Sequence, residues 1–282
     1  MLAKADPLRR CRPLLGTYVE IAADTPGGRG DLDAAFEAVA AVHRSMSFHE
    51  EDSDLGRLRR APAGTAVRVS PDTAVVLRLA GELFDATGGL FDVAMAPTLV
   101  AAGFLPMPEG VALADMTGTA ADIEVLDDRH VRCRRPLLID LGGIAKGHAV
   151  DRAVGVLVAR GARQGIVNAG GDLRVFGPEA GTIGIRSQDG PVERFVALRD
   201  GALCSSANRD SRRETGGGIS TPHLGRGRQP VICEGIVSVV AETCIVADAM
   251  TKVAVADEAL AASLLARYGG ELLPAVPRSA SA

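Results

Sequence analysis

The segment "DLGGIAKGHAVD", from Asp140 to Asp151, concentrates residues that can bind an anion. A glycine-rich turn that opens a helix exposes backbone N–H groups, which attract phosphate, and Lys146 would add positive charge. The spacing is neither G-x-x-x-x-G-K-[ST] nor G-x-G-x-x-G, so it matches neither the P-loop nor the dinucleotide-binding motif. These residues alone leave a phosphate site and a tight structural turn as equal alternatives.

Two further glycine turns carry an acidic residue. "TGGLFDVAMAP" presents Asp92 beside Phe91, and "NAGGD" places Gly170 and Gly171 before Asp172. Each turn by itself is more typical of a connection than of a site. Three such turns in one chain indicate a ligand that the backbone approaches closely from several sides.

Asp248 is the single residue most suited to chemistry. It lies in "CIVADAMTKVAV", a predicted helix apolar enough to be buried, and a buried carboxylate must be paired or bind a metal. Lys252 follows four residues later on the same helical face and can form an ion pair. Alternatively, Asp248 holds Mg²⁺, which prefers oxygen ligands. Spacing alone favours the ion pair.

Other catalytic patterns find little support. No H-x-x-x-H or H-x-x-E spacing links the histidines, which are His43, His49, His130, His148 and His223. The chain has no G-x-S-x-G, and "CSSAN" offers serines for which the sequence names no base.

Predicted strands and helices must position these residues. Strands are expected at "PLLGTYVEIAA", "VRCRRPLLIDL", "GIVNAGGDLRVFG" (strand, glycine turn, strand), "TIGIRS", "RFVALRDGALCSS" and "EGIVSVVAE". Helices are expected at "DLDAAFEAVAAVHRSMS", "SPDTAVVLRLAGELFDATGG", "GHAVDRAVGVLVARGA" and, as one closing helix, "CIVADAMTKVAVADEALAASLLARYG". Ser70 is a suitable N-cap, with Pro71 at the first helical position. The polar stretch 207–230 is expected to be a mobile surface loop.

Composition limits the classes of protein. With 282 residues, 47% of them hydrophobic, and no evident linker, we expect one domain over 10–273 and a disordered tail over 274–282. A net charge of -4 and only 3% aromatic residues argue against a nucleic-acid-binding protein. The five cysteines lack C-x-x-C spacing and fit a reducing compartment. No apolar run approaches the ~20 residues of a membrane span, and no secretory signal is seen. We therefore expect a cytoplasmic location, or a periplasmic one if the N-terminus is truncated.

Taken together and in this order, the motifs resemble the FAD:protein FMN transferase family, also called ApbE-like. The resemblance covers about Leu14 to Ala256, through "LLGTYVEI", "MSFHEEDSDLGRLRR", "TGGLFDVAMAP", "IDLGGIAKGHAVDRAV", "IVNAGGDLRVFG" and "SVVAETCIVADAMTK". It implies a single T-fold-like α+β domain with antiparallel sheets flanked by helices. It also implies Mg²⁺-dependent transfer of FMN from FAD to a threonine hydroxyl of another protein, with release of AMP. The acceptor would belong to a redox complex.

The resemblance also implies roles for individual residues. The flavin nucleotide would contact Leu15, Gly16, His49, Leu90, Phe91, Asp92, Gly142, His148, Gly170 and Gly171. Mg²⁺ would be bound by the backbone carbonyl of Ala145, by Asp248 as the essential catalytic aspartate, and by Thr251. This reverses the preference for the ion pair.

The chain departs from the family pattern at two places. The family usually has a threonine four residues after the metal-binding aspartate, where this chain has Lys252; Thr251 lies one position earlier, roughly 100° round the helix. The segment "STPHLGRGRQP" lacks the family's Asp-Pro and Thr-Gly, and His223 is displaced in it. Two alternatives stay open: an FAD-binding accessory protein without turnover, and an FAD pyrophosphatase that gives FMN and AMP.

Overall fold

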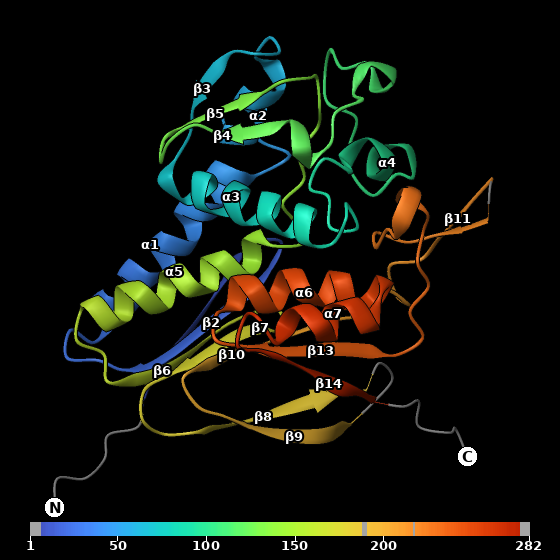
Figure 1. The fold of residues 1–282 in the computed structure, drawn as a ribbon. Coiled ribbons are helices and arrows are strands. Elements are labelled where there is room, and N and C mark those ends of the chain that lie inside the picture. Colours follow the sequence, from blue (N-terminus) through green and yellow to red (C-terminus); the bar gives the residue numbers. More distant parts are fainter. Residues whose placement is uncertain (1–6, 188–190, 217, 277–282) are drawn as a thin grey trace, which may run out of the picture.

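A seven-stranded antiparallel sheet forms the base of the molecule (Figure 1). The computed structural model describes residues 7–187, 191–216 and 218–276. In spatial order the strands of this sheet are β1 (Leu8–Leu14), β2 (Thr17–Asp24), β6 (Gln164–Ala169), β7 (Asp172–Phe176), β10 (Gly201–Ser206), β13 (Ile236–Ala241) and β14 (Glu271–Val276). The order places the first and last strands at opposite edges.

Four helices cover one face of this sheet, and a hairpin lies against the other (Figure 1). The helices are α1 (Arg29–Met46), α5 (Ala145–Ala159), α6 (Cys244–Ala256) and α7 (Glu258–Leu265). Between sheet and helices lies the main core, whose largest fully buried side chains include Phe36, Ile21, Leu32 and Leu157. The hairpin consists of β8 (Gly181–Arg186) and β9 (Val192–Leu198), and its Ile185 and Leu198 form a second cluster with Leu173, Val175 and Leu203 of the sheet. Strands β7 and β10 at the centre of the sheet are therefore covered on both faces.

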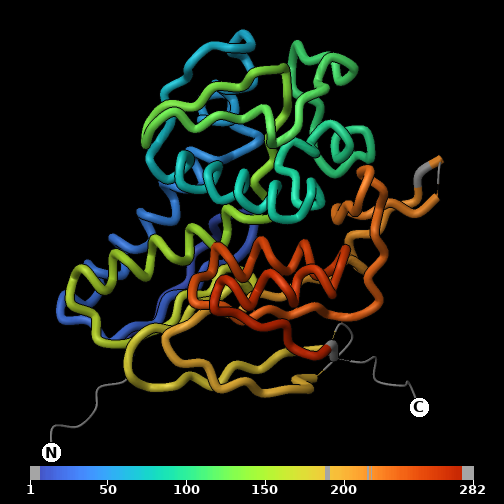
Figure 2. The backbone as a smooth tube through the Cα atoms, in the orientation of Figure 1, coloured from blue at the N-terminus to red at the C-terminus, as the bar shows by residue number. Residues whose placement is uncertain are grey.

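A second group of elements stands above the helices (Figure 2). It contains α2 (Asp54–Arg60), α3 (Pro71–Ala86), α4 (Ala96–Ala101), short 3₁₀ turns at Leu113–Asp115 and Ala120–Asp122, and a small sheet of order β3 (Ala66–Arg68), β5 (His130–Cys133), β4 (Ile123–Val125). The chain returns from it to α5 through residues 134–144. This arrangement agrees with the predicted class of antiparallel sheets flanked by helices.

The helix predictions are largely confirmed. Ser70 caps α3 by accepting the Thr73 N–H at 3.1 Å, and Pro71 opens the helix, as its fixed φ favours. The predicted closing helix is in fact two. Asp257 has extended backbone, ends α6, and caps α7 by accepting the Leu260 N–H at 3.0 Å. An aspartate that competes for backbone N–H groups favours such a break.

Three strand and loop predictions need correction. "PLLGTYVEIAA" is a hairpin rather than one strand, because Leu15 (φ 57°) and Gly16 (φ 69°) turn the chain between β1 and β2. The strand predicted across "VRCRRPLLIDL" ends at Cys133 in the small sheet, since Pro136 cannot donate a ladder hydrogen bond. Strand β14 continues to Val276, because it pairs with β13, so the predicted tail begins too early; residues 277–282 lie outside the described residues.

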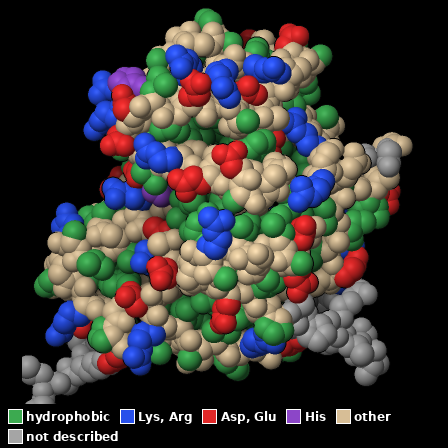
Figure 3. Space-filling model, in the orientation of Figure 1, with side chains coloured by type: hydrophobic (Ala, Val, Ile, Leu, Met, Phe, Trp, Pro, Cys, Tyr) green, Lys and Arg blue, Asp and Glu red, His purple; other side chains and the backbone are tan. Residues whose placement is uncertain are grey.

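The stretch 207–230, predicted as a loop, also contains ordered elements. β11 (Arg213–Thr215) and β12 (Gly218–Ser220) pair, and a 3₁₀ turn covers Arg226–Arg228. Within the described part of the chain, no helix combines the length and apolar character that crossing a membrane requires. On the face drawn in Figure 3, basic and acidic side chains are interspersed rather than gathered by sign.

Candidate functional site

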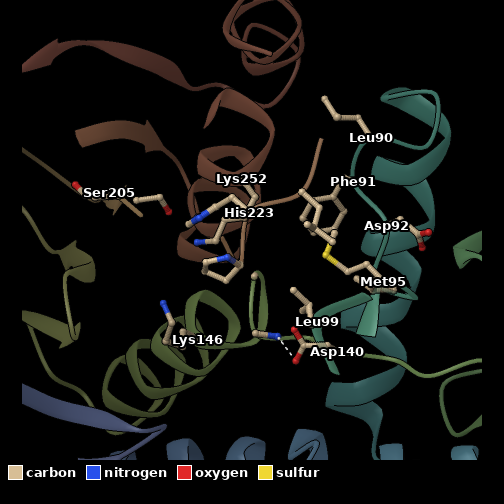
Figure 4. Close-up of a pocket in the computed structure, with 17 residues that line it drawn as sticks. Leu90, Phe91, Asp92, Met95, Leu99, Asp140, Lys146, Ser205, His223 and Lys252 are labelled. Carbon is tan, nitrogen blue, oxygen red and sulfur yellow. Dashed lines mark hydrogen bonds between the residues drawn. The ribbon is translucent and has the colours of Figure 1, made fainter. Parts of the chain in front are cut away.

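A cavity of about 360 Å³ lies where the α5–α6 layer meets the segment that follows α3. One wall is apolar and consists of Leu90, Phe91, Met95 and Leu99, while the other carries Lys146, Lys252, His223, Ser205 and Ser206 (Figure 4). Asp140, Gly142 and Gly143 close one side. The volume lies within the range of ligand pockets, about 300–1,000 Å³.

The glycine-rich loop allows α5 and α6 to approach each other at the floor of this cavity. A Cβ on Gly147 would lie 2.2 Å from the carbonyl oxygen of Cys244, so no other residue fits there. The approach lets the Gly147 N–H donate to Asp248 Oδ2 at 2.9 Å. One turn further along α5, Asp151 accepts the Cys244 and Ile245 N–H groups at 3.0 and 2.8 Å and so caps α6. The loop therefore positions two helices as well as bordering the cavity.

Asp248 and Lys252 form an ion pair across one turn of α6. The Lys252 Nζ lies 2.6 Å from Asp248 Oδ1 and 3.1 Å from Thr251 Oγ1. Asp248 and Thr251 are both 0% exposed, whereas the Lys252 side chain is 22% exposed and lines the cavity. Burial by itself would raise the pKa of Asp248, but the positive charges of Lys252 and Lys146 outweigh it and hold that pKa below its usual value. The Asp248 carboxylate is thus ionised and is the counter-ion of the Lys252 ammonium.

A second pair, Lys146 with Asp172, lies beside the first. Burial would lower the pKa of Lys146, but the Asp248 and Asp172 carboxylates raise it, so the side chain is charged. Burial and the Asp248 charge raise the pKa of Asp172, although the positive charges of Lys146 and Lys252 oppose this shift.

The sequence contains three lysines, Lys4, Lys146 and Lys252, among 31 basic residues. Both lysines in the described part of the chain therefore lie in this cavity.

His223 lines the cavity, although the sequence analysis had noted it only as displaced from the family pattern. It lies in the cavity near both lysines (Figure 4), and burial followed by the charges of Lys252 and Lys146 lowers its pKa to about 4. Its Nδ1 is buried and has no hydrogen-bond partner among the described residues. The imidazole is therefore neutral at neutral pH and has an unused ring nitrogen.

Four of the ten predicted flavin contacts line the cavity: Leu90, Phe91, Asp92 and Gly142. The Asp92 carboxylate turns away from the cavity, accepting the Ala94 and Ala120 N–H groups at 2.9 Å and pairing with Arg228 at 3.1 Å. Asp92 thus fixes the segment in which Leu90 and Phe91 face the cavity. Its ion pair with Arg228 also holds the stretch 207–230 beside the cavity.

The β1–β2 and β6–β7 turns hold four more predicted contacts, outside the cavity lining. The Gly170 N–H donates to the Tyr18 carbonyl at 3.2 Å, and a Cβ on Gly170 would lie 2.5 Å from Thr17 Oγ1. Gly170 and Gly171 have φ values of 65° and 102°, which favour glycine. These turns, with Leu15 and Gly16 in the first, place Asp172 beneath Lys146. Their contact with flavin stays a prediction.

The two predicted histidine contacts differ in position. His49 lies near Asp140: burial raises the pKa of Asp140, and the Gly142 N–H and His49 partly oppose that shift. His148 is buried and its Nε2 lies 2.9 Å from Asp72 Oδ1 at the start of α3, so it ties α5 to α3. It does not line the cavity.

The fold and the cavity together define a ligand-binding α+β protein whose site has one cationic and one apolar wall. The chain belongs to the ApbE family, whose family model matches residues 15–272. A Rhodobacter capsulatus relative named FAD:protein FMN transferase is 30% identical over 63% of this chain and 36% of its own length. A Vibrio cholerae protein of the same name is 26% identical over 61% of this chain and 55% of its own length. The chain thus spans about a third to a half of these relatives.

Solved structures share the fold over almost the whole chain. The Thermotoga maritima ApbE protein superposes with a TM-score of 0.81 at 26% identity, covering 95% of this chain and 93% of that one. The Pseudomonas stutzeri flavinyl transferase ApbE gives 0.80 at 21% identity, covering 96% and 92%. The similarity confirms the predicted fold class.

Proposed function

We propose that this chain transfers FMN from FAD to a threonine hydroxyl of an acceptor protein and releases AMP. The observation that carries the proposal is the cavity's division into two walls. Lys146 and Lys252 suit a diphosphate, and the wall around Phe91 suits a flat, largely apolar ring system. FAD combines both parts in one molecule. The name shared by the curated relatives supports the same assignment.

In the proposed reaction, the acceptor's hydroxyl oxygen forms a bond to the flavin-side phosphorus of the diphosphate. The bond from that phosphorus to the bridging oxygen breaks, and AMP leaves with the bridging oxygen and its electron pair. The hydroxyl proton passes to His223 Nδ1, which is neutral and unpartnered among the described residues. The bound diphosphate would offset the charges of the two lysines, and this raises the basicity of His223 in the complex.

Mg²⁺, which the family resemblance implies, does not fit the residues that would bind it. The described residues hold no cluster of three or more histidine, cysteine or acidic side chains that could bind a metal, so the site would depend on Ala145, Asp248 and Thr251. The Lys252 ammonium already contacts the oxygens of Asp248 and Thr251. Asp248 therefore positions Lys252, and the proposed reaction involves no metal ion.

The acceptor and the compartment complete the proposal. Because FMN is a redox group, we expect the acceptor to be a component of an electron-transfer complex that presents an exposed threonine. All five cysteines are free thiols, and Cys204 and Cys244, with sulfurs 3.5 Å apart, remain unlinked. Free thiols support a reducing compartment such as the cytoplasm.

The test is to incubate the purified chain with FAD and a pool of threonine-containing peptides. AMP release together with covalent flavin on peptides, seen as fluorescence after denaturing electrophoresis, supports the transferase. AMP and free FMN without peptide labelling would make the chain a pyrophosphatase. FAD retained without AMP release would make it a flavin-binding accessory protein. Arg78→Met, which removes an exposed cation paired with Asp128 outside the cavity, is the control variant.

A further inference from the structure

We propose that the Lys252 ammonium takes the place of a divalent cation, so that this chain binds and cleaves the FAD diphosphate without metal. The inference rests on the proposed function and deepens it. Three observations carry it: the hydrogen bonds of Thr251, the position of the ammonium between two buried oxygens, and the packing of the Lys252 stem.

Thr251 has no lone pair left for a metal. Its O–H donates to the Asp248 carbonyl oxygen at 2.8 Å, so the hydroxyl can only accept from its other neighbours. Those neighbours are Ser206 Oγ at 2.7 Å and Lys252 Nζ at 3.1 Å. A hydroxyl has one donor and two acceptor lone pairs, and these three contacts use all of them.

The ammonium occupies the space that a shared cation would need. Mg²⁺ binds oxygen at about 2.0–2.1 Å with near-octahedral geometry. Asp248 and Thr251 are fully buried, so an ion from the cavity meets the partly exposed Lys252 before it meets either oxygen. An ion that contacted both oxygens would lie against an ammonium of the same sign.

Lys252 is also held as a fixed charge rather than a mobile one. Its stem packs against the loop, where a Cβ on Gly143 would lie 3.3 Å from Lys252 Cγ. The ammonium has three N–H donors, of which Asp248 and Thr251 take two, so the third can reach a ligand in the cavity. Lysine carries a compact point charge, unlike the planar guanidinium that supplies most of this chain's basic residues.

The charges nearby suit a diphosphate. Lys146 presents a second ammonium to the same space (Figure 4). When the bridging bond breaks, negative charge develops on the oxygen that leaves with AMP, and a fixed ammonium can stabilise it as a metal would.

The experiment compares wild type with Lys252→Thr and Lys252→Met, each in EDTA and in excess Mg²⁺. FAD affinity is read by flavin fluorescence, and metal uptake by the loss of the free Mn²⁺ electron paramagnetic resonance signal. Wild type is expected to bind FAD equally, within about twofold, in both conditions and to take up no Mn²⁺. Lys252→Thr is expected to bind FAD at least about tenfold more weakly in EDTA, to recover with Mg²⁺, and to take up Mn²⁺. Lys252→Met is expected to bind weakly in both conditions.

The outcomes separate this inference from the proposed function. Wild type that binds FAD only with Mg²⁺, or takes up Mn²⁺, overturns the inference even if FMN transfer is observed. Wild type that binds FAD and releases AMP in EDTA but never transfers FMN overturns the transferase and leaves the lysine assignment standing. AMP release that requires Mg²⁺ overturns the metal-free cleavage. Folded wild type that binds no FAD in either condition overturns both. Arg78→Met, which should match wild type throughout, controls for general loss of positive charge.

Discussion

The backbone N–H of Gly147 donates to the buried carboxylate of Asp248 at 2.9 Å, joining residues 101 positions apart in the sequence. This hydrogen bond exists because Gly147 lets α5 and α6 touch. Gly147→Ala is expected to reduce the unfolding free energy by ~2 kcal/mol or more, because its Cβ would meet backbone that cannot rotate away. Chemical denaturation measures the change.

The matched control for this variant lies two turns further along α5. Gly155 is exposed and has no atom within 4 Å of the position of a Cβ. Gly155→Ala should therefore raise stability by ~0.5–1 kcal/mol through helix propensity. Equal effects at the two glycines would show that the helix contact at Gly147 is not tight.

A double-mutant cycle tests the coupling of Asp248 to Lys252. Asp248→Asn leaves the ammonium without its carboxylate partner and is expected to cost ~1–3 kcal/mol of unfolding free energy. Adding Lys252→Met should return part of that loss, because the unpaired charge is gone. Urea denaturation of the four proteins gives the coupling energy, and additive single losses would mean that the pair contributes nothing.

His223 makes stability fall on acidification. Its pKa is lowered from 6.5 to about 4 in the folded protein, so between these values the unfolded chain binds more protons and stability rises with pH. The contribution is present above pH ~6.5 and is lost as the pH falls toward 4, with a slope of at most ~1.4 kcal/mol per pH unit. Urea denaturation across this range measures the slope.

His223→Gln is expected to remove this part of the pH dependence. His43→Gln, on the exposed face of α1, is the control and should keep the wild-type slope. A His223→Gln protein that still loses stability at the wild-type rate would assign the acid sensitivity to other groups.

His148 is expected to act on stability rather than on FAD. Its hydrogen bond is the main cause that lowers the pKa of Asp72, against burial, and it joins α5 to α3. His148→Phe should cost ~1 kcal/mol of unfolding free energy and leave the dissociation constant for FAD within about twofold. Fluorescence titration and denaturation of the same preparation measure both. Weaker FAD binding at unchanged stability would instead support the diphosphate contact that the family resemblance implies.

Local signals predicted the helices well because each signal acts within a few residues. Ser70, Pro71 and the apolar spacing of α3 lie in one short segment, so no distant contact was needed to place that helix. The break at Asp257 was missed because apolar spacing continues across it. The strand predicted up to residue 141 failed because its apolar residues are buried by the upper elements and pair with no strand.

The site was harder to predict because long-range contacts build it. Nothing local indicates that Lys146 pairs with Asp172, or that stretch 207–230 delivers His223 to the cavity. The ion pair between Asp248 and Lys252 is the exception, since i,i+4 spacing predicts it directly. The spacing therefore predicted the ion pair that the structure contains, although the family resemblance had favoured a metal ion bound by Asp248.

The two lysines that face the cavity have a consequence for chemical labelling. Amine-acylating reagents modify lysine side chains and the chain's α-amino group, and of the three lysines only Lys4 lies outside the described residues. Within those residues every acylated amine must therefore belong to a cavity lysine. Mass spectrometry of the labelled chain therefore reports whether the cavity is occupied. Any ligand that covers the two ammonium groups protects the peptides that contain them from acylation, whatever the spectroscopic properties of the ligand.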